Sequence, residues 1–326
     1  MKILAYSHRA DETIYFQKFS EKYNIEVVLC DDAPNMENAD LAKGFQCVSI
    51  ITTPVPAELI KKFHEVGVKF ISTRTIGYDH IDIKKAKELD IHIGNVTYSP
   101  NGVADYTLMM ILMVIRKMKS IIECSNVQDY SLKGVQGREL KNLTVGVIGT
   151  GKIGQTVIKY LSGFGCKIIA HSLHEKEEAK KYAEYVSLEE LFKNSDIITL
   201  HIPAKEDNYH MINKNSIEMM KDDVCIINTA RGSLINTGDL ICGIEQKKIG
   251  GAALDVIEHE SNLYYNDLKG QILDNRELAI LKSYPNVIIT PHTAFYTDQS
   301  VSDMVENSIL SCILFMEGKE NPWEVI

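Results

Sequence analysis

The sequence of 326 residues contains no Cys-x-x-Cys pair and no regular cysteine framework. An odd number of cysteines without a framework excludes the disulfide-rich class of small secreted domains and is typical of a reducing compartment. We therefore expect a cytoplasmic protein. The seven cysteines are widely spaced, at Cys30, Cys47, Cys124, Cys166, Cys225, Cys242 and Cys312.

Long apolar runs are also missing. The longest, residues 106–115, is well below the roughly 20 residues that a membrane-spanning helix needs. The apolar run at the start of the sequence is too short for a signal peptide and predicts a first strand. No cluster of lysine and arginine interrupts an acidic composition with a formal net charge of -9. These absences argue against a membrane or a nucleic acid as a partner. We also expect no metal cofactor.

Strand-like and helix-like segments alternate throughout, which is the signature of a parallel α/β architecture. Helix-like segments include residues 57–66, 83–89 and 108–122, the last of which could join two domains. The predicted strands are residues 3–6, 26–29, 48–51, 69–72 and 92–95, followed by 143–148, 166–170, 197–201, 224–228, 252–256 and 287–290. The second group has the six strands that two mononucleotide-binding halves require.

The length suggests two domains, each with its own core. A helical segment at residues 301–317 follows the sixth strand of the second group, when that sheet is already complete. We therefore place this helix on the first domain, which makes the first domain discontinuous. The predicted boundaries are 1–99 and 299–326 for a substrate domain, and 100–298 for a dinucleotide-binding domain.

A Gly-x-Gly-x-x-Gly pattern at Gly149, Gly151 and Gly154 lies between a predicted strand and a predicted helix. The first glycine permits a tight turn, the second lets the backbone approach a pyrophosphate, and the third allows close packing of helix on strand. The helix N-terminus adds unpaired N–H groups for the phosphates. Alone this pattern is weak, but its strand–helix context favours a dinucleotide site over a chance turn.

An acid about 20 residues further on would bind the ribose 2′-hydroxyl of NAD. Ser172 occupies that position, and no Asp or Glu is there. A hydroxyl tolerates a 2′-phosphate, to which His171, His174 and Lys176 could add positive charge, although each of these alone reads as an ordinary surface residue. The sequence therefore predicts NAD or NADP (NADH or NADPH) as the cofactor.

Three segments with chemically useful side chains follow three successive predicted strands of the second domain. They carry Arg231, the pair Glu258 and Glu260, and His292. Ligands bind beyond the carboxyl ends of the strands in an open parallel sheet, so these residues are expected together. Arg can hold a carboxylate in a two-point fork, and His exchanges protons near neutral pH. Spacing alone leaves both glutamates open as the partner of His292.

The whole chain resembles the D-isomer-specific 2-hydroxyacid dehydrogenases. The resemblance is carried by residues 149–154 (GTGKIG), 228–232 (NTARG), 255–260 (DVIEHE) and 291–296 (PHTAFY). It implies a Rossmann domain inserted into a flavodoxin-like substrate domain. It also implies Arg231, Glu260 and His292 as catalytic residues, which favours Glu260 over Glu258.

The resemblance further implies binding residues. Substrate contacts would come from the backbone N–H groups of Ile76 and Gly77, from Tyr98 and Phe295, and from Arg231 and His292. Besides the three glycines, cofactor contacts would come from Lys152, Ile153, Ser172, Ile202, Pro203, Asn208, Thr229, Ala230, Arg231 and Asp255.

Within this family, residues 71–77, 95–100 and 103–106 look most like the D-lactate dehydrogenases, including the vancomycin-resistance branch, which implies reduction of pyruvate to D-lactate. Bulkier 2-keto acids such as 2-ketoisocaproate and phenylpyruvate stay an alternative. A dinucleotide-sensing corepressor-like binding protein is a third hypothesis, disfavoured by the compact length. The family implies a homodimer, for which residues 106–115 could supply the interface, although an ordinary core helix fits them equally well.

Overall fold

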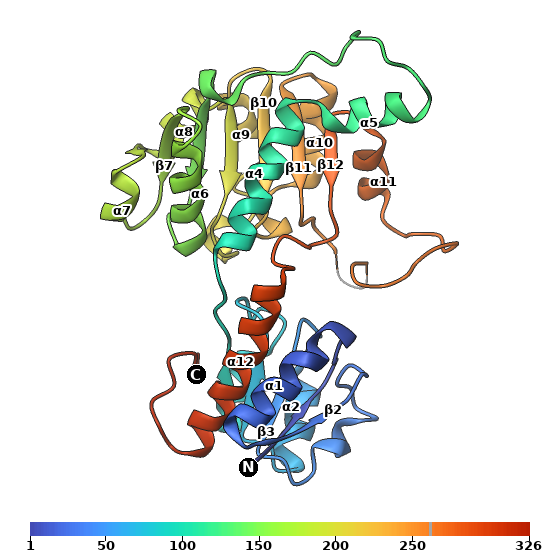
Figure 1. Cartoon of the computed structure of the whole chain (residues 1–326), viewed down its shortest axis with the longest axis vertical. Coiled ribbons are helices and arrows are strands. Elements are labelled where there is room, and N and C mark those ends of the chain that lie inside the picture. The colour runs from blue at the N-terminus through green and yellow to red at the C-terminus, as the bar shows by residue number, and fades with distance from the viewer. Residues whose placement is uncertain (261–262) are drawn as a thin grey trace. The chain divides into compact units, whose positions relative to one another are not determined.

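The computed structural model describes residues 1–260 and 263–326. The chain forms two compact units (Figure 1): unit 1 comprises residues 1–99 and 296–326, and unit 2 comprises residues 100–295. Unit 1 is discontinuous because the chain returns to it with helix α12 (Asp298–Met316). Residues 296–298, which the sequence analysis assigned to the dinucleotide-binding domain, lie in unit 1.

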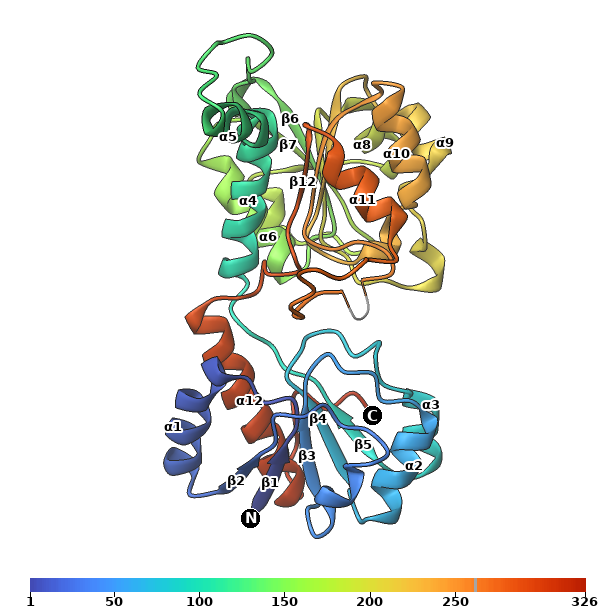
Figure 2. The same cartoon turned by 90° about the vertical axis from the view of Figure 1, so that its right-hand side faces the viewer.

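Unit 1 is built on a parallel sheet with the strand order β2-β1-β3-β4-β5. Side chains that alternate along its strands feed two separate cores. One core contains α1 and α12, and the other contains α2 and α3, so helices cover both faces (Figure 2). The elements are β1 (Lys2–Ala5), α1 (Thr13–Tyr23), β2 (Glu26–Leu29), β3 (Cys47–Ile50), α2 (Ala57–Glu65), β4 (Phe70–Thr73), α3 (Ile83–Glu88) and β5 (His92–Gly94).

Unit 2 is built on a longer parallel sheet, whose order among the described residues is β12-β11-β10-β9-β6-β7-β8. This is the doubly wound order of a Rossmann domain, so the predicted fold class is confirmed. The strands are β6 (Thr144–Ile148), β7 (Lys167–His171), β8 (Glu184–Tyr185), β9 (Ile197–Leu200), β10 (Val224–Asn228), β11 (Ile249–Leu254) and β12 (Val287–Ile289).

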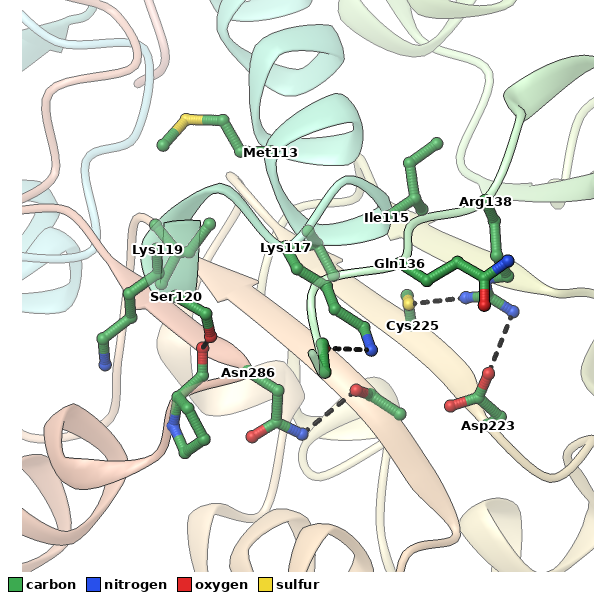
Figure 3. Close-up of a pocket in the computed structure, with 15 residues that line it drawn as sticks. Met113, Ile115, Lys117, Lys119, Ser120, Gln136, Arg138, Asp223, Cys225 and Asn286 are labelled. Atoms are coloured by element: carbon green, nitrogen blue, oxygen red, sulfur yellow. Dashed lines mark hydrogen bonds and ion pairs between the residues drawn. The ribbon is translucent and has the colours of Figure 1, made fainter. Parts of the chain in front are cut away.

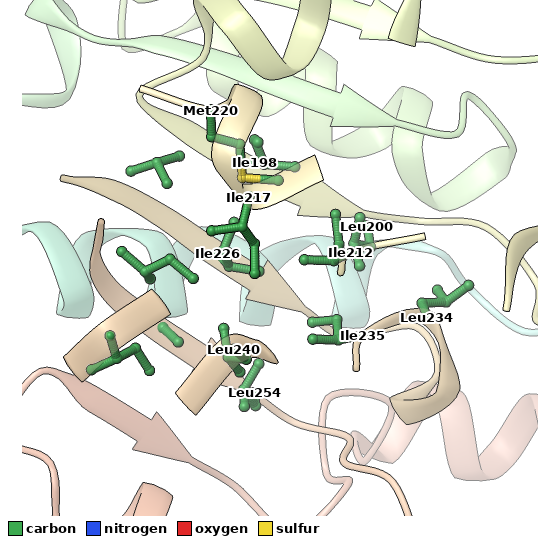
Figure 4. Close-up of a cluster of buried hydrophobic side chains, with 14 of the residues drawn as sticks. Ile198, Leu200, Ile212, Ile217, Met220, Ile226, Leu234, Ile235, Leu240 and Leu254 are labelled. Atoms are coloured by element: carbon green, nitrogen blue, oxygen red, sulfur yellow. The ribbon is translucent and has the colours of Figure 1, made fainter. Parts of the chain in front are cut away.

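Both faces of the unit 2 sheet are apolar, as parallel sheets require. One face packs against α4 and α6, and the other against α8, α9, α10 and α11. Figure 4 shows the second core, in which Ile198, Leu200 and Ile226 of the sheet face Ile217 and Leu240 of the covering helices. The helices are α4 (Asn101–Ile115), α5 (Met118–Asn126), α6 (Lys152–Ser162), α7 (Glu177–Lys180), α8 (Leu188–Asn194), α9 (Lys214–Met219), α10 (Thr237–Glu245) and α11 (Arg276–Ser283).

Two sequence predictions need correction. The six-strand count was wrong, because β8 adds a seventh strand among the described residues. Two residues are too short to show an apolar periodicity, so this edge strand left no signal. The segment 108–122 is also not one helix, because the chain turns at Lys117 with φ of 52° between α4 and α5.

The register of the unit 2 sheet aligns the carboxyl ends of its strands. Ile148 pairs with His171 and Leu200, Leu200 pairs with Asn228, and Asn228 pairs with Leu254. Leu254 in turn pairs with Ile289. The segments that carry the predicted site residues of unit 2 follow these strands. They therefore begin at the same edge of the sheet, within a few residues of this row.

Candidate active site

The glycine-rich loop follows β6 and turns into α6. Gly149 has φ of 95°, and a Cβ there would lie 2.4 Å from the His201 carbonyl oxygen. A Cβ on Gly154 would lie 2.0 Å from the Gly149 carbonyl oxygen, whereas nothing lies within 4 Å of a Cβ placed on Gly151. The first and third glycines are therefore demanded by close packing, and the second leaves open space at the N-terminus of α6.

The N-terminus of α6 is available to an anion. Its N-cap, Gly151, offers no side chain to the first N–H groups of the helix. The helix dipole and these N–H groups favour a phosphate, and Lys152 and Ile153 begin the helix. The arrangement fits the pyrophosphate of a dinucleotide.

The end of β7 lies beside this loop. Ser172 directly follows the strand and is half-buried, while Leu173 and His174 are exposed. Tyr185 on the missed strand β8 donates its hydroxyl proton to Thr150 Oγ1 at 2.8 Å and accepts from the Lys176 N–H at 2.9 Å. Tyr185 thus links the glycine loop to the segment that follows Ser172, a role that only the tertiary structure reveals.

The loop after β9 carries a second histidine that sequence reasoning overlooked. The Nε2 atom of His201 lies 2.9 Å from Thr199 Oγ1, and its carbonyl packs against Gly149. Burial lowers the pKa of His201 to about 3, so this imidazole is neutral near pH 7. It is therefore not an imidazolium proton donor.

Asn208 closes the same loop through its own side chain. Its Nδ2 donates to the Pro203 carbonyl at 2.8 Å, and its Oδ1 accepts from the Lys205 N–H at 2.8 Å. Ile202 and Pro203, two of the predicted cofactor contacts, lie at the start of this loop. The amide of Asn208 therefore fixes the conformation of the loop.

The segment after β10 presents Arg231. Buried Asn228 holds this turn by donating to the Arg231 carbonyl at 2.8 Å and accepting from the Ala230 N–H at 3.0 Å. Thr229 lies 3.0 Å from Thr107 through their hydroxyl groups. A Cβ on Gly232 would lie 2.1 Å from the Ile257 carbonyl, so only glycine lets this turn approach the segment that carries the glutamates.

His292 and Glu260 form a direct pair. The Nδ1 atom of His292 lies 2.8 Å from Glu260 Oε1, and Glu260 Oε2 accepts from the Ile257 N–H at 3.1 Å. The side chains are 24% and 27% exposed, so both reach solvent. Because Nδ1 is engaged, Nε2, which has no hydrogen-bond partner in the described part of the chain, is the ring nitrogen available for proton transfer.

Glu258 has a different partner. Its Oε1 lies 2.6 Å from His210 Nε2, and its Oε2 accepts from the Thr237 N–H and hydroxyl at 2.9 and 2.8 Å. Burial raises the pKa of Glu258, but these hydrogen bonds outweigh it and hold the pKa below its usual range. Glu258 therefore stabilises the start of α10, and the geometry favours Glu260 as the partner of His292.

Asp255 organises the segment that carries His292. Its fully buried carboxylate accepts from the Thr290 hydroxyl at 2.6 Å and from the N–H groups of Thr293 and Ala294 at 3.0 and 2.9 Å. The Asp255 carbonyl accepts from the His292 N–H at 2.8 Å. This support holds His292 at φ of 52°, in the sparsely populated left-handed region.

Three aromatic residues surround the pair. The ring of Phe295 lies 6.3 Å from that of His292 in an edge-on arrangement. The Tyr265 hydroxyl donates to the His292 carbonyl at 2.8 Å, a contact that sequence reasoning missed. Burial, with Glu260 and Asp255 nearby, raises the pKa of Tyr264 well above its usual value, so its hydroxyl stays protonated.

The predicted carboxylate loop lies in unit 1, after β4. Thr75 donates its hydroxyl proton to the Gly77 carbonyl at 2.6 Å, and Asn95 Nδ2 donates to the Ile76 carbonyl at 2.8 Å. The N–H groups of Ile76 and Gly77 have no acceptor among the described residues. The carbonyl groups of Ile76 and Gly77 are therefore engaged in hydrogen bonds, while their N–H groups are available as donors. Tyr98, the other predicted substrate contact of this unit, is half-buried.

A pocket of about 290 Å³ lies elsewhere in unit 2 (Figure 3). Its lining includes Asp223, Gly250 and Asn286, which precede or begin strands, so it lies at the opposite edge of the sheet from the glycine loop. Arg138 Nη2 lies 3.0 Å from Cys225 Sγ there. Burial raises the pKa of the Cys225 thiol to about 11. No predicted site residue lines this pocket.

No cluster of three or more potential metal ligands occurs in residues 1–260 and 263–326. Over the same residues, no helix is both long and apolar enough to cross a membrane.

Comparison with known proteins identifies the family. Residues 108–294 match the D-isomer specific 2-hydroxyacid dehydrogenase, NAD binding domain. An aromatic 2-oxoacid reductase of Clostridium sporogenes is 47% identical over 95% of both chains, and a D-specific alpha-keto acid dehydrogenase of Enterococcus faecalis is 45% identical over 97% of both. The structure of a D-lactate dehydrogenase from Treponema pallidum has a TM-score of 0.91 at 31% identity, with both chains covered completely.

The fold, the glycine loop and the His–Glu pair thus define a nucleotide-dependent oxidoreductase. This chain belongs to the D-isomer specific 2-hydroxyacid dehydrogenase family. Its activity is that of an NAD-binding D-2-hydroxyacid dehydrogenase, and the hypothesis of a purely sensing protein is set aside.

Proposed function

We propose that the chain reduces pyruvate to D-lactate. The observation that carries 2-oxo acid reduction is the His292–Glu260 pair, whose Nδ1 and Oε1 atoms are 2.8 Å apart at the strand ends that also hold Arg231 and the glycine loop. The similarity to D-lactate dehydrogenases supports pyruvate as the substrate. Reduction of a 2-oxo acid needs a hydride at C2, a proton at the carbonyl oxygen and a cation for the carboxylate. These residues supply the last two.

When bound, the nicotinamide supplies the hydride. Arg231 binds the substrate carboxylate and polarises the neighbouring keto oxygen. In unit 1, the N–H groups of Ile76 and Gly77 are proposed as carboxylate donors. His292 donates the proton from Nε2 to the developing alkoxide. Glu260 orients the imidazole through Nδ1 and stabilises its protonated form.

A bulkier 2-oxo acid is the second candidate substrate. The 47% identity to an aromatic 2-oxoacid reductase favours it, as do the aromatic rings near His292. One methylene in an apolar pocket changes selectivity by about 1–3 kcal/mol, so steady-state kinetics can separate these substrates.

The test is steady-state kinetics with pyruvate, 2-ketoisocaproate and phenylpyruvate, each with NADH and NADPH. We expect the highest kcat/KM with pyruvate. A value for phenylpyruvate more than about tenfold higher, equivalent to ~1.4 kcal/mol, would assign the second candidate instead. Turnover with none of the three would refute both.

The cofactor preference depends on Ser172, and we propose that both NADH and NADPH are used. An aspartate at this position would pair with the ribose hydroxyls of NADH and repel the 2′-phosphate of NADPH. Ser172→Asp is therefore expected to lower kcat/KM for NADPH at least about tenfold more than for NADH, a difference of ~1.4 kcal/mol.

The matched control is Leu173→Asp, which places the same charge one residue further on, at a side chain that is 82% exposed. It should change the NADPH to NADH ratio little. Equal effects of Ser172→Asp on kcat/KM for both cofactors would show that Ser172 does not lie near the 2′-position of the ribose.

We also propose that the enzyme is a homodimer through unit 2. Half of residues 106–115 are buried, among them the fully buried Met110 and Ile111. An exposed apolar surface lies further on instead: α5 has no buried residue, and Tyr130 and Leu132 are 77% and 87% exposed. Light scattering should therefore give twice the monomer mass, reduced by Tyr130→Ser with Leu132→Ser. A monomeric wild type would refute this proposal.

A further inference from the structure

Arg74 directly precedes the carboxylate loop, which contains Ile76 and Gly77. Together with Arg231, it is one of two arginines at predicted substrate contacts. Its position in the sequence suits a substrate-binding arginine. In the structure, however, Arg74 is 0% exposed and is among the largest fully buried side chains of unit 1. A charge this deep is maintained only with full pairing, so its partners indicate its role.

The guanidinium of Arg74 has a partner for each of its nitrogens. Nε donates to Glu12 Oε1 at 2.9 Å, and Nη2 lies 3.3 Å from Glu12 Oε2, a fork to a carboxylate that is itself fully buried. Nη2 also donates to the carbonyls of Tyr6 and Ser7 at 3.0 and 3.1 Å. Nη1 donates to Ser49 Oγ at 3.0 Å.

These contacts join segments that are distant in sequence but neighbours in the sheet. Tyr6 and Ser7 follow β1, Ser49 lies on β3, and Arg74 follows β4, and these three strands are adjacent. Figure 2 shows them side by side in unit 1. One buried ion pair therefore fixes the carboxyl end of the unit 1 sheet, where the loop with Ile76 and Gly77 begins.

A chain of hydroxyl groups extends this network to α12. Ser49 Oγ lies 2.7 Å from Ser308 Oγ, and Ser308 donates to Ser72 Oγ at 2.9 Å. Ser308 is on α12, the helix with which the chain returns to unit 1 after the His292 segment. Arg74, the sheet and the returning helix thus share one buried polar network, which ends at the residue directly before the loop.

We propose that Arg74, held by Glu12, is a positioning residue that orients the Ile76 and Gly77 N–H groups toward the carboxylate of the 2-oxo acid without touching the substrate. The inference rests on the proposed function of these N–H groups. A buried ion pair is poor at adding stability, and apolar residues of the same size often serve as well. Here the ion pair instead fixes the geometry of the loop, and carboxylate binding requires a fixed geometry.

Glu12→Gln tests the inference, because it keeps the size of the side chain and removes its charge. We expect the KM for the 2-oxo acid to rise at least about tenfold, which corresponds to ~1.4 kcal/mol. The value of kcat should change much less, and the Kd for NADH should stay the same, because the nucleotide site is in unit 2. Ser49→Ala removes the Nη1 acceptor and the contact with Ser308 but leaves the Glu12 fork, so it should raise KM in the same direction by a smaller factor.

Ser311→Ala is the matched control. Ser311 is a fully buried hydroxyl on α12, as Ser308 is, but it accepts from Asn321 Nδ2 at 2.9 Å and makes no hydrogen bond to the Arg74 network among the described residues. The KM of the Ser311→Ala enzyme for the 2-oxo acid should equal that of the wild type. A folded Glu12→Gln enzyme with unchanged KM, or the same rise in KM for Ser311→Ala, would overturn the inference.

If Glu12→Gln does not fold, the KM values of Ser49→Ala and Ser311→Ala are compared instead. A rise in KM for Ser49→Ala alone supports the inference, and equal KM values overturn it. A wild type that turns over no 2-oxo acid would refute the proposed function itself, which is a separate and recognisable result.

Discussion

Replacing His292 with alanine should reduce turnover of the 2-oxo acid by about 10²–10⁴-fold, the usual range for loss of a general acid. The physical reason is that Nε2 is the expected proton donor, oriented by the 2.8 Å contact between Nδ1 and Glu260. Binding of NADH should persist, because the glycine loop and α6 do not depend on this imidazole. Nucleotide fluorescence titration and steady-state kinetics measure the two effects separately.

The matched control for His292→Ala is His259→Asn. His259 adjoins Glu260, is exposed and also has a positive φ, of 57°, which asparagine tolerates. The His259 variant should retain nearly full activity. If His292→Ala reduced the 2-oxo acid as fast as the wild type, the proton would have to come from another group, and the proposed mechanism would be wrong.

Arg231→Lys should lower kcat/KM for the 2-oxo acid by about 10²-fold. Lysine keeps the positive charge but loses the planar fork that binds both carboxylate oxygens. A hydrogen bond to a charged group contributes about 1.5–3 kcal/mol, and ~1.4 kcal/mol corresponds to a factor of ten. NADH binding should change much less than kcat/KM, since Arg231 is only one of many predicted cofactor contacts and lysine keeps its charge.

Arg276→Lys is the control for this substitution. Arg276 is an exposed arginine at the start of α11 in the same unit, and its replacement should leave both kinetic constants near their original values. If the kinetic constants of Arg231→Lys were close to those of the wild type, Arg231 would not bind both carboxylate oxygens of the substrate.

Much of the fold could be predicted because parallel α/β structure has strong local signals. Every strand predicted from an apolar run is present with shifts of a few residues at its ends, and the doubly wound order follows general topological rules. The strand β8 was missed because two residues carry no periodicity. The break at Lys117 was missed because apolar residues resume a helical spacing directly after it, at Met118, Ile121 and Ile122.

Candidate residues were predictable where strand ends carry unusual chemistry, as with Arg231 and His292. The partner of His292 was not predictable from spacing, since Glu258 and Glu260 lie two residues apart on one segment. Only the packing of that segment against α10 and the segment before α9 engages Glu258 with Thr237 and His210, at 2.8 and 2.6 Å, and leaves Glu260 to His292. Long-range contacts of this kind have no local signature.

By itself, the sequence determined the class of this protein: a glycine loop between strand and helix, and an arginine, a glutamate and a histidine after successive strands. Those are local patterns, set by backbone geometry and residue chemistry within a few positions. Only the tertiary structure decided what each polar side chain contacts. It buried Arg74 against Glu12 and brought Tyr185 and Tyr265 to the site, because hydrogen-bond partners are chosen by strand order and packing between segments far apart in the chain.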